Sequence, residues 1–421
     1  MSAVLDAIEA KKQDEPLSDA LIAEVVAGYT SREVPDYQMA ALLMAIRLKG
    51  LGYAETVALT RAMADSGPRY AFPECVDKHS TGGVGDKVTL CALPIVVACG
   101  VPVAKLSGRG LGITGGTIDK LEAIPGFSVV LTRERFRRQV DEIGFALAEA
   151  GELAPADKAL YALRDTTGTV DSMPLIGSSI VSKKVATGAG HLLYDVKAGS
   201  GAFMKTLDQA RELAQLLVRL SGALGIGARA VITDMDTALG SAVGNALEVR
   251  ESVAFLRGEP VRSDLDEVCR DVAAELLGLR GIADARGRVD AAIADGSAFA
   301  KLAEVVRAQG GDPDALADLP VSAVAAEVTA PHAGVVAELD ALGIGRASLA
   351  LGAGRQRKDD VLDFGAGVEQ LVRPGDRVEA GQPVARLRGT SGVEEAVRHA
   401  TGALRLSDAP VTPRSHLLER L

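Results

Sequence analysis

Two glycine-rich loops, each following a β-prone run and leading into a helical one, constrain the fold of this chain most. The first is KHSTGGVGDKVTL, from Lys78 to Leu90, and the second is KLSGRGLGITGGTIDKLE, from Lys105 to Glu122. From Asp77 onward, glycine loops separate β-prone runs, VPVAKLS and FSVVL, from longer helical runs such as RERFRRQVDEIG. This alternation predicts an α/β sheet with helices on its faces.

The chain on either side of this alternation has a different pattern. The segment from Leu5 to Lys49 is helical, with Ser18 as a capping residue and Gly50 as a stop signal, and the segment from Ala154 to Lys184 is helical again. The tail has β-prone segments between Gly, Pro and Asp turns, as in VRPGDRVEAGQPVARLRG. It resembles the hammerhead of biotinyl or lipoyl carrier domains, but it lacks their Met-Lys-Met hairpin. We therefore expect a structural cap.

Composition narrows the classes of ligand. The 421 residues can form two or three domains, and the net charge of −10 argues against binding to nucleic acid or to an anionic membrane. The four cysteines show no metal-binding spacing, and the N-terminus has no apolar stretch of a secretory signal, so a reducing cytoplasm is the expected location. An anionic small ligand would need a local positive pocket.

The first glycine loop has the composition of an anion site. Glycines let the backbone approach a ligand, while Ser, Thr, Lys and exposed N–H groups donate hydrogen bonds to anions. The loop is not a Walker loop, because Asp86, Lys87 and Val88 break the required Gly-Lys-Ser/Thr sequence. For this loop alone, a plain turn between a strand and a helix is an equal alternative.

The second loop favours a phosphate-binding site over a plain turn. Its glycines fit G-x-G-x-x-G, which is a weak signal for a dinucleotide site. Its hydroxyl and basic residues suit a phosphate or sugar instead, and they are Ser107, Arg109, Thr114 and Thr117. Two such loops, about one crossover unit apart, can converge at the carboxyl ends of neighbouring parallel strands.

Four blocks of sequence resemble the signatures of the thymidine/pyrimidine-nucleoside phosphorylase family, in the same order and at similar spacing. They are DKHSTGGVGDKVTL, SGRGLGITGGTIDKLEAIPGF, LAPADKALYALRDTTGTVDS and DVKAGSGAFM. The resemblance implies that inorganic phosphate attacks C1′ of a pyrimidine nucleoside (uridine, thymidine or deoxyuridine) and yields free base and α-(deoxy)ribose 1-phosphate. It implies phosphate as co-substrate and no organic cofactor.

The resemblance also assigns residues to each substrate. Positions that match the family's phosphate contacts are Lys78, Ser80, Thr89, Ser107 and Thr117. Positions that match its pyrimidine contacts are Arg164, Ser179 and Lys183, and the last two share a face if the segment is helical. Without the resemblance, the hydroxyls would be expected as caps or turn residues, and the Lys183–Lys184 pair as a solvated surface.

Two more residues are expected to act on the nucleoside. His79, in the first loop, can donate to O2 of the base as a general acid, beside the catalytic contributions of Arg164 and Lys183. Lys105 stands where thymidine-restricted members have an apolar residue, and its ammonium can bind a 2′-hydroxyl or a phosphate oxygen. The presence of Lys105 therefore predicts activity on uridine as well as on thymidine.

This chain resembles the pyrimidine-nucleoside branch of the family, whose members hold a monovalent cation. We expect this ion to be potassium. The matching ligands would be the carbonyls of Gly85, Lys87, Leu239 and Ala242 and the carboxylate of Glu251. Lys87 departs from the family's usual small hydroxyl residue, and its ammonium could weaken or displace the ion. Further departures are Ile113, where many members have His, and the segment EAGEL from Glu149 to Leu153.

The fold implied by the resemblance has three parts and forms a homodimer. They are a small all-helical domain with the base site (1–66 and 156–186), a large mixed α/β domain with the phosphate site (67–155 and 187–322) and a C-terminal β-rich cap (323–421). Domain closure is expected, with hinges near 67–72, 151–155 and 187–190.

Other functions compete with this prediction. A thymidine-restricted phosphorylase is one alternative. An anthranilate-type phosphoribosyltransferase would need magnesium and acidic residues for pyrophosphate, and the trio at Arg164, Ser179 and Lys183 would have no purpose. A non-catalytic nucleoside-binding regulator need not keep both sites, and an NAD-dependent oxidoreductase is supported by the glycine pattern alone.

Overall fold

The computed structural model describes residues 2–110, 112–113, 115–357, 359–412 and 414–421. Leu111 and Thr114 of the second glycine loop therefore lie outside the described residues, as does Lys358. Backbone contacts divide the chain into two units. The first comprises Met1–Cys75, Ala150–Leu192 and Glu212–Ala228, and the second comprises Val76–Glu149, Leu193–Arg211 and Arg229–Leu421.

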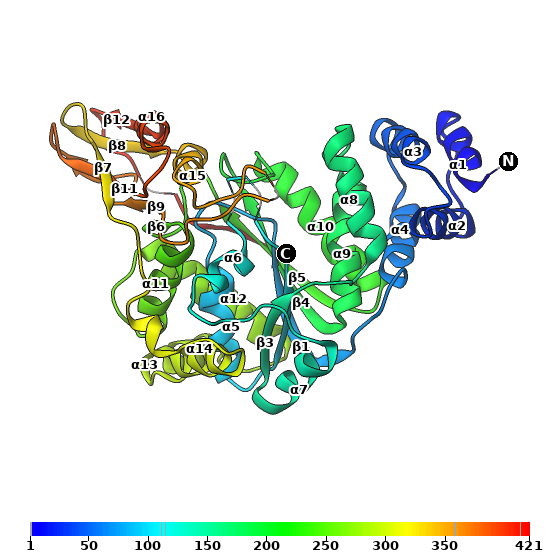
Figure 1. Ribbon diagram of the computed structural model, residues 1–421, viewed down its shortest axis with the longest axis horizontal. Coiled ribbons are helices and arrows are strands. Elements are labelled where there is room, and N and C mark those ends of the chain that lie inside the picture. Colours follow the sequence, from blue (N-terminus) through cyan, green and yellow to red (C-terminus); the bar gives the residue numbers. More distant parts are fainter. Residues whose placement is uncertain (1, 111, 114, 358, 413) are drawn as a thin grey trace. The chain divides into compact units, whose positions relative to one another are not determined.

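The first unit is helical, as predicted. Its helices are α1 (Ala3–Lys12), α2 (Asp19–Thr30), α3 (Asp36–Lys49), α4 (Tyr53–Asp65), α8 (Pro155–Thr167), α9 (Met173–Thr187) and most of α10 (Leu207–Ala223) (Figure 1). The side chain of Ser18 caps α2 by accepting from the N–H of Leu21, and Gly50 ends α3 with φ 78°, so both sequence signals are confirmed. Apolar residues of α1–α4, α8 and α9 form a separate core.

The second unit contains a six-stranded sheet in the order β13-β5-β4-β1-β2-β3. Its strands are β1 (Phe72–Ser80), β2 (Val103–Ser107), β3 (Phe145–Glu149), β4 (Ala189–Ala198), β5 (Gly227–Asp234) and β13 (Leu417–Arg420). The boundaries between the units fall within β1, β4, α10 and β5, and directly after β3. Strands β1, β2 and β3 are parallel neighbours, so the two glycine loops leave the same edge of the sheet, as the sequence predicts.

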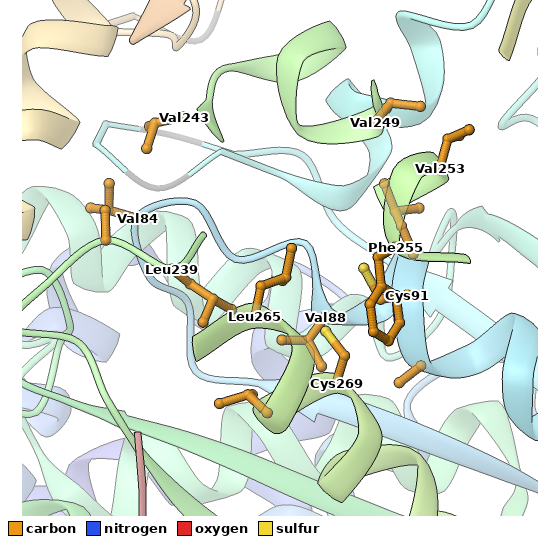
Figure 2. Packing of buried hydrophobic residues seen from close by; sticks show 14 of the residues in the cluster. Val84, Val88, Cys91, Leu239, Val243, Val249, Val253, Phe255, Leu265 and Cys269 are labelled. Atoms are coloured by element: carbon orange, nitrogen blue, oxygen red, sulfur yellow. The ribbon is translucent and has the colours of Figure 1, made fainter. Parts of the chain in front are cut away.

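Helices of the second unit pack around a core of aliphatic side chains. They are α5 (Val88–Ala98), α6 (Thr117–Glu122), α7 (Arg133–Ile143), α11 (Asn245–Leu256), α12 (Ser263–Leu279), α13 (Ala285–Ala294), α14 (Ser297–Ala308) and the short 3₁₀ helix η1 (Asp314–Ala317). Helix α5 carries an apolar run and is buried from Val88 to Val97. Its Val88 and Cys91 lie near Leu265 and Cys269 of α12 (Figure 2).

The C-terminal part is β-rich and also belongs to the second unit. Its elements are β7 (Val324–Thr329), β8 (Gly334–Leu339), α15 (Ala341–Ala350), β9 (Gly367–Gln370), β10 (Arg377–Val378), β11 (Pro383–Arg388), α16 (Val393–Ala403) and β12 (Leu404–Ser407). They form a sheet β10-β8-β12 and a sheet β6-β9-β11-β7. Strand β6 (Ala242–Val243) comes from the segment before α11, so the α/β part supplies one edge of the second sheet.

One β-prone run was predicted wrongly as a strand-like element. FSVVL, residues 127–131, has no strand, and β3 at Phe145–Glu149 takes the sheet position beside β2. The run receives a backbone hydrogen bond from Glu149 N to Val129 O, and Ser128 N donates to Gln309 O, which is too few for a ladder. Among the described residues, no helix combines the length and apolar character required to cross a membrane.

Candidate active site

The first glycine loop begins at the end of β1 over a buried cluster of charged side chains. The Lys78 ammonium lies 3.1 Å from an Asp195 carboxylate oxygen and 3.7 Å from one of Asp86. The Lys197 ammonium lies 2.8 Å from the same oxygen of Asp195. Lys78, Asp195 and Lys197 are all fully buried. We call these four residues, Lys78, Asp86, Asp195 and Lys197, the buried charge cluster.

Mutual attraction keeps the cluster ionised. Burial alone would raise the pKa of the Asp195 carboxyl, but the ammonium groups of Lys197 and Lys78 outweigh burial and hold that pKa below its usual range. Burial would likewise lower the pKa of Lys78, and the carboxylates of Asp86 and Asp195 raise it instead. The Lys78 ammonium and the carboxylates of Asp86 and Asp195 therefore stay charged although they are buried.

The cluster leaves hydrogen-bonding capacity unused. Neither the Lys78 nor the Lys197 ammonium has a hydrogen bond of good geometry within the described part of the chain, although both lie at ion-pair distance from Asp195. Asp195 Oδ2 is the acceptor nearest to both ammonium groups, and each ammonium has three N–H groups, so each keeps N–H groups that a bound anion could accept from. Such an arrangement favours the binding of an anion at this position.

The loop itself is braced by Asp86. The Ser80 hydroxyl donates a short hydrogen bond to one oxygen of Asp86, and the N–H of Val88 donates to the other at 3.2 Å. The Ser80 hydroxyl also accepts from the N–H of Gly82 at 3.2 Å. Ser80, expected to contact phosphate, therefore holds the loop in shape as well.

Lys120 joins the two glycine loops. Its ammonium donates to the carbonyl of Asp86 in the first loop at 2.8 Å and to that of Gly115 in the second at 3.2 Å. It also lies 3.1 Å from the carboxylate of Glu248 on α11. The convergence of the two loops, expected from strand order, is thus made by a buried lysine that the sequence analysis did not single out.

The second loop is also held by the C-terminal part. The N–H of Gly112 donates to the carbonyl of Arg355 at 2.8 Å, and the Arg355 guanidinium pairs with Asp119 of α6. Asp119 in turn accepts from the N–H of Gly110 at 2.7 Å. Ile113 stands where many family members have a histidine. It packs against the apolar core of the second unit and lies close to Gly345 of α15, where an added Cβ would be 3.2 Å from the Cβ of Ile113.

The remaining expected phosphate contacts lie on the same two loops. Thr89 is in the first turn of α5, Ser107 ends β2, and Thr117 begins α6. Lys105 lies deeper, because its ammonium donates to the carbonyl of Lys78 and lies 3.3 Å from the Asp77 carboxylate. The Lys105 residue is only 4% exposed. It supports the backbone of the first loop in this structure.

The expected base contacts lie together in the helical unit. Ser179 and Lys183 are one turn apart on α9, as predicted, and the Lys183 ammonium donates to the Ser179 hydroxyl at 3.0 Å. It also pairs with Asp157 of α8. The Arg164 guanidinium donates to the carbonyls of Thr169, Val170 and Leu175, which fixes the turn between α8 and α9.

Donor counts leave groups for a ligand in this trio. Three of the five guanidinium N–H groups of Arg164 are used by backbone carbonyls, and two of the three N–H groups of Lys183 are used by Asp157 and Ser179. Burial lowers the pKa of Arg164 from its ordinary value, against the opposing effect of Asp157. Within the described residues, two N–H groups of Arg164 and one of Lys183 therefore remain available to an acceptor.

His79 follows Lys78 on β1. Its ring lies 6.1 Å from that of Tyr194 on β4, in an edge-to-face arrangement at 73°. This contact orients the imidazole at the end of the strand that carries the first glycine loop. Its expected role as a proton donor stays a prediction.

Sequence reasoning missed Asp86, Lys120, Asp195 and Lys197 as parts of the site. A signal for two of them is present in YDVKA, because Asp195 and Lys197 are two residues apart in a β-prone run and so point to the same side of a strand. Opposite charges inside an otherwise buried strand indicate a paired, functional position.

Comparison with known proteins agrees with this geometry. Residues 73–299 match the model of the glycosyl transferase family, a/b domain, and residues 5–67 match its helical bundle domain. Residues 335–407 match the pyrimidine nucleoside phosphorylase C-terminal domain. The chain is 46% identical to thymidine phosphorylase of Mycobacterium tuberculosis, over 98% of this chain and 97% of that protein. It is 44% identical to pyrimidine-nucleoside phosphorylase of Bacillus subtilis, over 98% of each.

The chain belongs to the thymidine/pyrimidine-nucleoside phosphorylase family.

Its relation to a neighbouring family is limited to the fold. The solved structure of anthranilate phosphoribosyltransferase from Thermus thermophilus is similar with a TM-score of 0.56, over 73% of this chain and 99% of that chain, at 22% identity. The likeness explains why such an enzyme is a reasonable competitor on fold alone.

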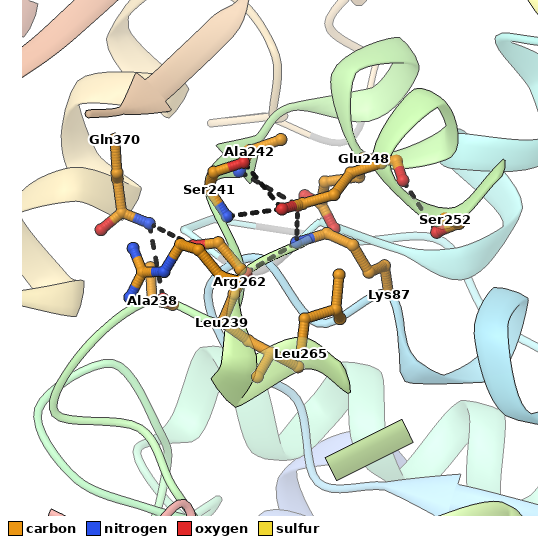
Figure 3. Close-up of polar contacts among 12 residues, drawn as sticks. Lys87, Ala238, Leu239, Ser241, Ala242, Glu248, Ser252, Arg262, Leu265 and Gln370 are labelled. Atoms are coloured by element: carbon orange, nitrogen blue, oxygen red, sulfur yellow. Dashed lines mark hydrogen bonds and ion pairs between the residues drawn. The ribbon is translucent and has the colours of Figure 1, made fainter. Parts of the chain in front are cut away.

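The five positions expected around a cation come together in the second unit, and one of them is a lysine. The Lys87 ammonium donates to the carbonyl of Leu239 at 2.6 Å (Figure 3). It also lies 2.9 Å from the Glu251 carboxylate. Gly85 lies close to the carbonyl oxygens of Leu239 and Ala242. A Cβ added at Gly85 would be 2.7 Å from the Leu239 oxygen and 3.4 Å from the Ala242 oxygen.

We predict that Asp195→Asn strongly destabilises the second unit, by about 3–5 kcal/mol, because it leaves the buried ammonium groups of Lys78 and Lys197 without their shared carboxylate. The folded pKa of Asp195 is depressed, so its contribution is present above its ordinary value of 3.8 and is lost as the pH falls through the folded pKa. Urea unfolding at neutral pH measures the difference.

The matched control is Asp208→Asn, whose carboxylate pairs with Arg211 at the surface and is 90% exposed. Its cost should stay below about 1 kcal/mol. Equal urea midpoints for Asp195→Asn and Asp208→Asn would contradict the role given to the buried charge cluster.

Proposed function

We propose that this protein catalyses the reversible phosphorolysis of pyrimidine nucleosides, with uridine, thymidine and deoxyuridine as substrates. The observation that carries the proposal is the meeting of two glycine loops over buried ammonium groups at one edge of the sheet. The names of its relatives, thymidine phosphorylase and pyrimidine-nucleoside phosphorylase, support the same chemistry.

Phosphate is the proposed nucleophile. The hydroxyls of Ser80, Thr89, Ser107 and Thr117 and the ammonium of Lys78 are the proposed contacts, with Lys197 added from its place in the buried charge cluster. These groups would hold the dianion and reduce its solvation while one oxygen attacks C1′. The new C–O bond forms as the glycosidic C–N bond breaks, with inversion at C1′.

The base is the proposed leaving group. Arg164, Lys183 and Ser179 would donate to its carbonyl oxygens and stabilise the negative charge that the ring gains. His79 would donate to O2. Because the proposed phosphate and base contacts belong to different units, turnover would require both units to act on one nucleoside, with 67–72, 151–155 and 187–190 as the proposed hinges.

The homodimer is a further part of this proposal, and α3 supplies a candidate surface. Tyr37, Ala41, Met44 and Leu48 are all exposed and follow one face of that helix, with Tyr37 75% and Leu48 73% exposed. Large apolar side chains in a row at the surface are typical of an interface. A second copy of the chain could cover them by the same face, as in an isologous dimer.

Competing functions account for fewer of these observations. A phosphoribosyltransferase shares the fold, but it gives no role to the donor trio of Arg164, Ser179 and Lys183. A non-catalytic regulator would bind nucleoside without releasing base. An oxidoreductase would be detected by a change in NADH fluorescence on binding.

We expect release of free base from uridine, thymidine and deoxyuridine only when inorganic phosphate is present. Substituting Lys183→Met should reduce the rate by roughly 10²–10³-fold, because a donor to the leaving base is lost. His79→Asn should reduce it by roughly 10²-fold or more if the imidazole acts as a general acid. Chromatography of the base with and without phosphate is the measurement.

Lys301→Met is the control for this assay, because that lysine pairs with the neighbouring Glu304 on α14 and has no proposed contact with substrate. Release of base without phosphate, or none from any nucleoside, would overturn the proposed reaction. A full rate for His79→Asn would remove His79 from it.

The uridine activity depends on Lys105 in this proposal. We expect Lys105→Met to lower kcat/KM for uridine at least roughly tenfold more than kcat/KM for deoxyuridine, because the two substrates differ only in the 2′-hydroxyl. The ratio separates this role from support of the loop, which would lower both equally. Poor uridine turnover in the wild type with no change of ratio in Lys105→Met would favour a thymidine-restricted enzyme.

Light scattering after size exclusion tests the dimer. The wild type should have the mass of two chains, and Leu48→Asp should shift the protein toward the monomer, because it places a charge in the α3 face. Val361→Asp, which changes a residue that is 95% exposed, should leave the mass unchanged. A monomeric wild type would overturn the dimer, and a dimeric Leu48→Asp would move the interface elsewhere.

A further inference from the structure

The Lys87 side chain occupies an oxygen-lined position between three segments of the second unit. Lys87 precedes α5, and its side chain is fully buried. Its ammonium donates to the Leu239 carbonyl at 2.6 Å (Figure 3). It also lies 2.9 Å from Oε2 of Glu251 on α11. The lysine thus ties the first glycine loop to the segment 239–242 and to α11.

The surrounding oxygens already have their partners. Oε1 of Glu251 accepts from the N–H and the hydroxyl of Ser241, each at 2.7 Å, and Oε2 accepts from the N–H of Ala242 at 3.1 Å as well as facing Lys87. A metal ion at this carboxylate would have to displace the ammonium. The ligand set implied for potassium therefore does not fit this chain as it stands.

Charge balance leads to the same conclusion. Helix α11 presents two buried carboxylates, and each has its own lysine, Glu251 with Lys87 at 2.9 Å and Glu248 with Lys120 at 3.1 Å. All four side chains are less than one-tenth exposed. A further cation would add an unbalanced charge next to an ammonium in a poorly screened environment, which is strongly unfavourable.

We propose that the Lys87 ammonium is a built-in replacement for the monovalent cation at this position, so that this protein binds no potassium there and needs none to hold its first glycine loop. An ammonium and a potassium ion carry the same charge, and both are satisfied by carbonyl and carboxylate oxygens. The tethered cation cannot dissociate, which makes the loop independent of the salt composition. The proposal concerns the loop and does not depend on the range of substrates.

Thermal unfolding of the whole protein tests this directly. Wild type is melted in potassium, sodium or choline chloride at a constant ionic strength of about 0.1 M. The midpoint should be the same in potassium as in choline. A saturable, potassium-specific rise in the wild-type midpoint would overturn the proposal.

Lys87→Thr provides the complementary arm. The substitution removes the ammonium and leaves the backbone carbonyls and Glu251 free to bind an ion. The midpoint of thermal unfolding of the variant should therefore fall below that of the wild type in choline. It should rise by roughly 5 °C in saturating potassium. Lys87→Met is the matched control, because its side chain fills the space without a charge and should show no such gain. A folded Lys87→Thr with no response to potassium would overturn the equivalence of ammonium and ion.

Binding of thallium(I), a potassium analogue with an NMR signal, gives a readout that involves neither stability nor turnover. Lys87→Thr should bind one thallium ion per chain that potassium displaces, and the wild type should bind none at this position. If neither variant folds, thermal unfolding and thallium titration of the wild type still decide the proposal. An ion bound to the wild type at this position would contradict it.

Discussion

The ammonium groups of Lys78 and Lys197 can be buried only because the Asp195 carboxylate lies beside both of them, with Asp86 completing the balance. Taking an isolated charge out of water costs several kcal/mol, and a neutral cluster reduces that cost through mutual attraction. The arrangement constrains the sheet, because β1 must bring Lys78 and β4 must bring Asp195 and Lys197 to the same place. It also constrains chemistry, since buried ammonium groups without complete hydrogen bonding favour an arriving anion.

Further lysines extend this principle around the first glycine loop. Lys120 connects that loop to the second loop and to α11, and Lys87 connects it to the segment 239–242 and again to α11. Lys105 supports the first glycine loop by donating a hydrogen bond to the carbonyl of Lys78. Glycine-rich loops have high conformational entropy, so several charge-assisted contacts are needed to hold one open geometry. The preorganised loop can then meet phosphate without a large ordering cost.

Much of the fold could be predicted from local patterns. Ser18 and Gly50 mark the ends of helices, and the two glycine loops follow neighbouring parallel strands. These predictions succeed because each depends on a few adjacent residues. The run FSVVL is not a strand, because β3 takes the position beside β2 and the run is joined to β3 by a backbone hydrogen bond from Glu149 N to Val129 O without forming a ladder. No local pattern states which of two β-prone runs obtains the partner.

The sequence by itself determined the family, the order of helical and α/β segments and the two phosphate-type loops, because these depend on composition and spacing along the chain. The tertiary structure decided which charges meet. Lys87 and Glu251 are far apart in the sequence, as are Lys78 and Asp195, yet each pair forms a buried contact. Whether a lysine binds substrate, supports a loop or takes the place of an ion depends on the distance and burial of its partners. Those quantities arise only when the strands and helices pack.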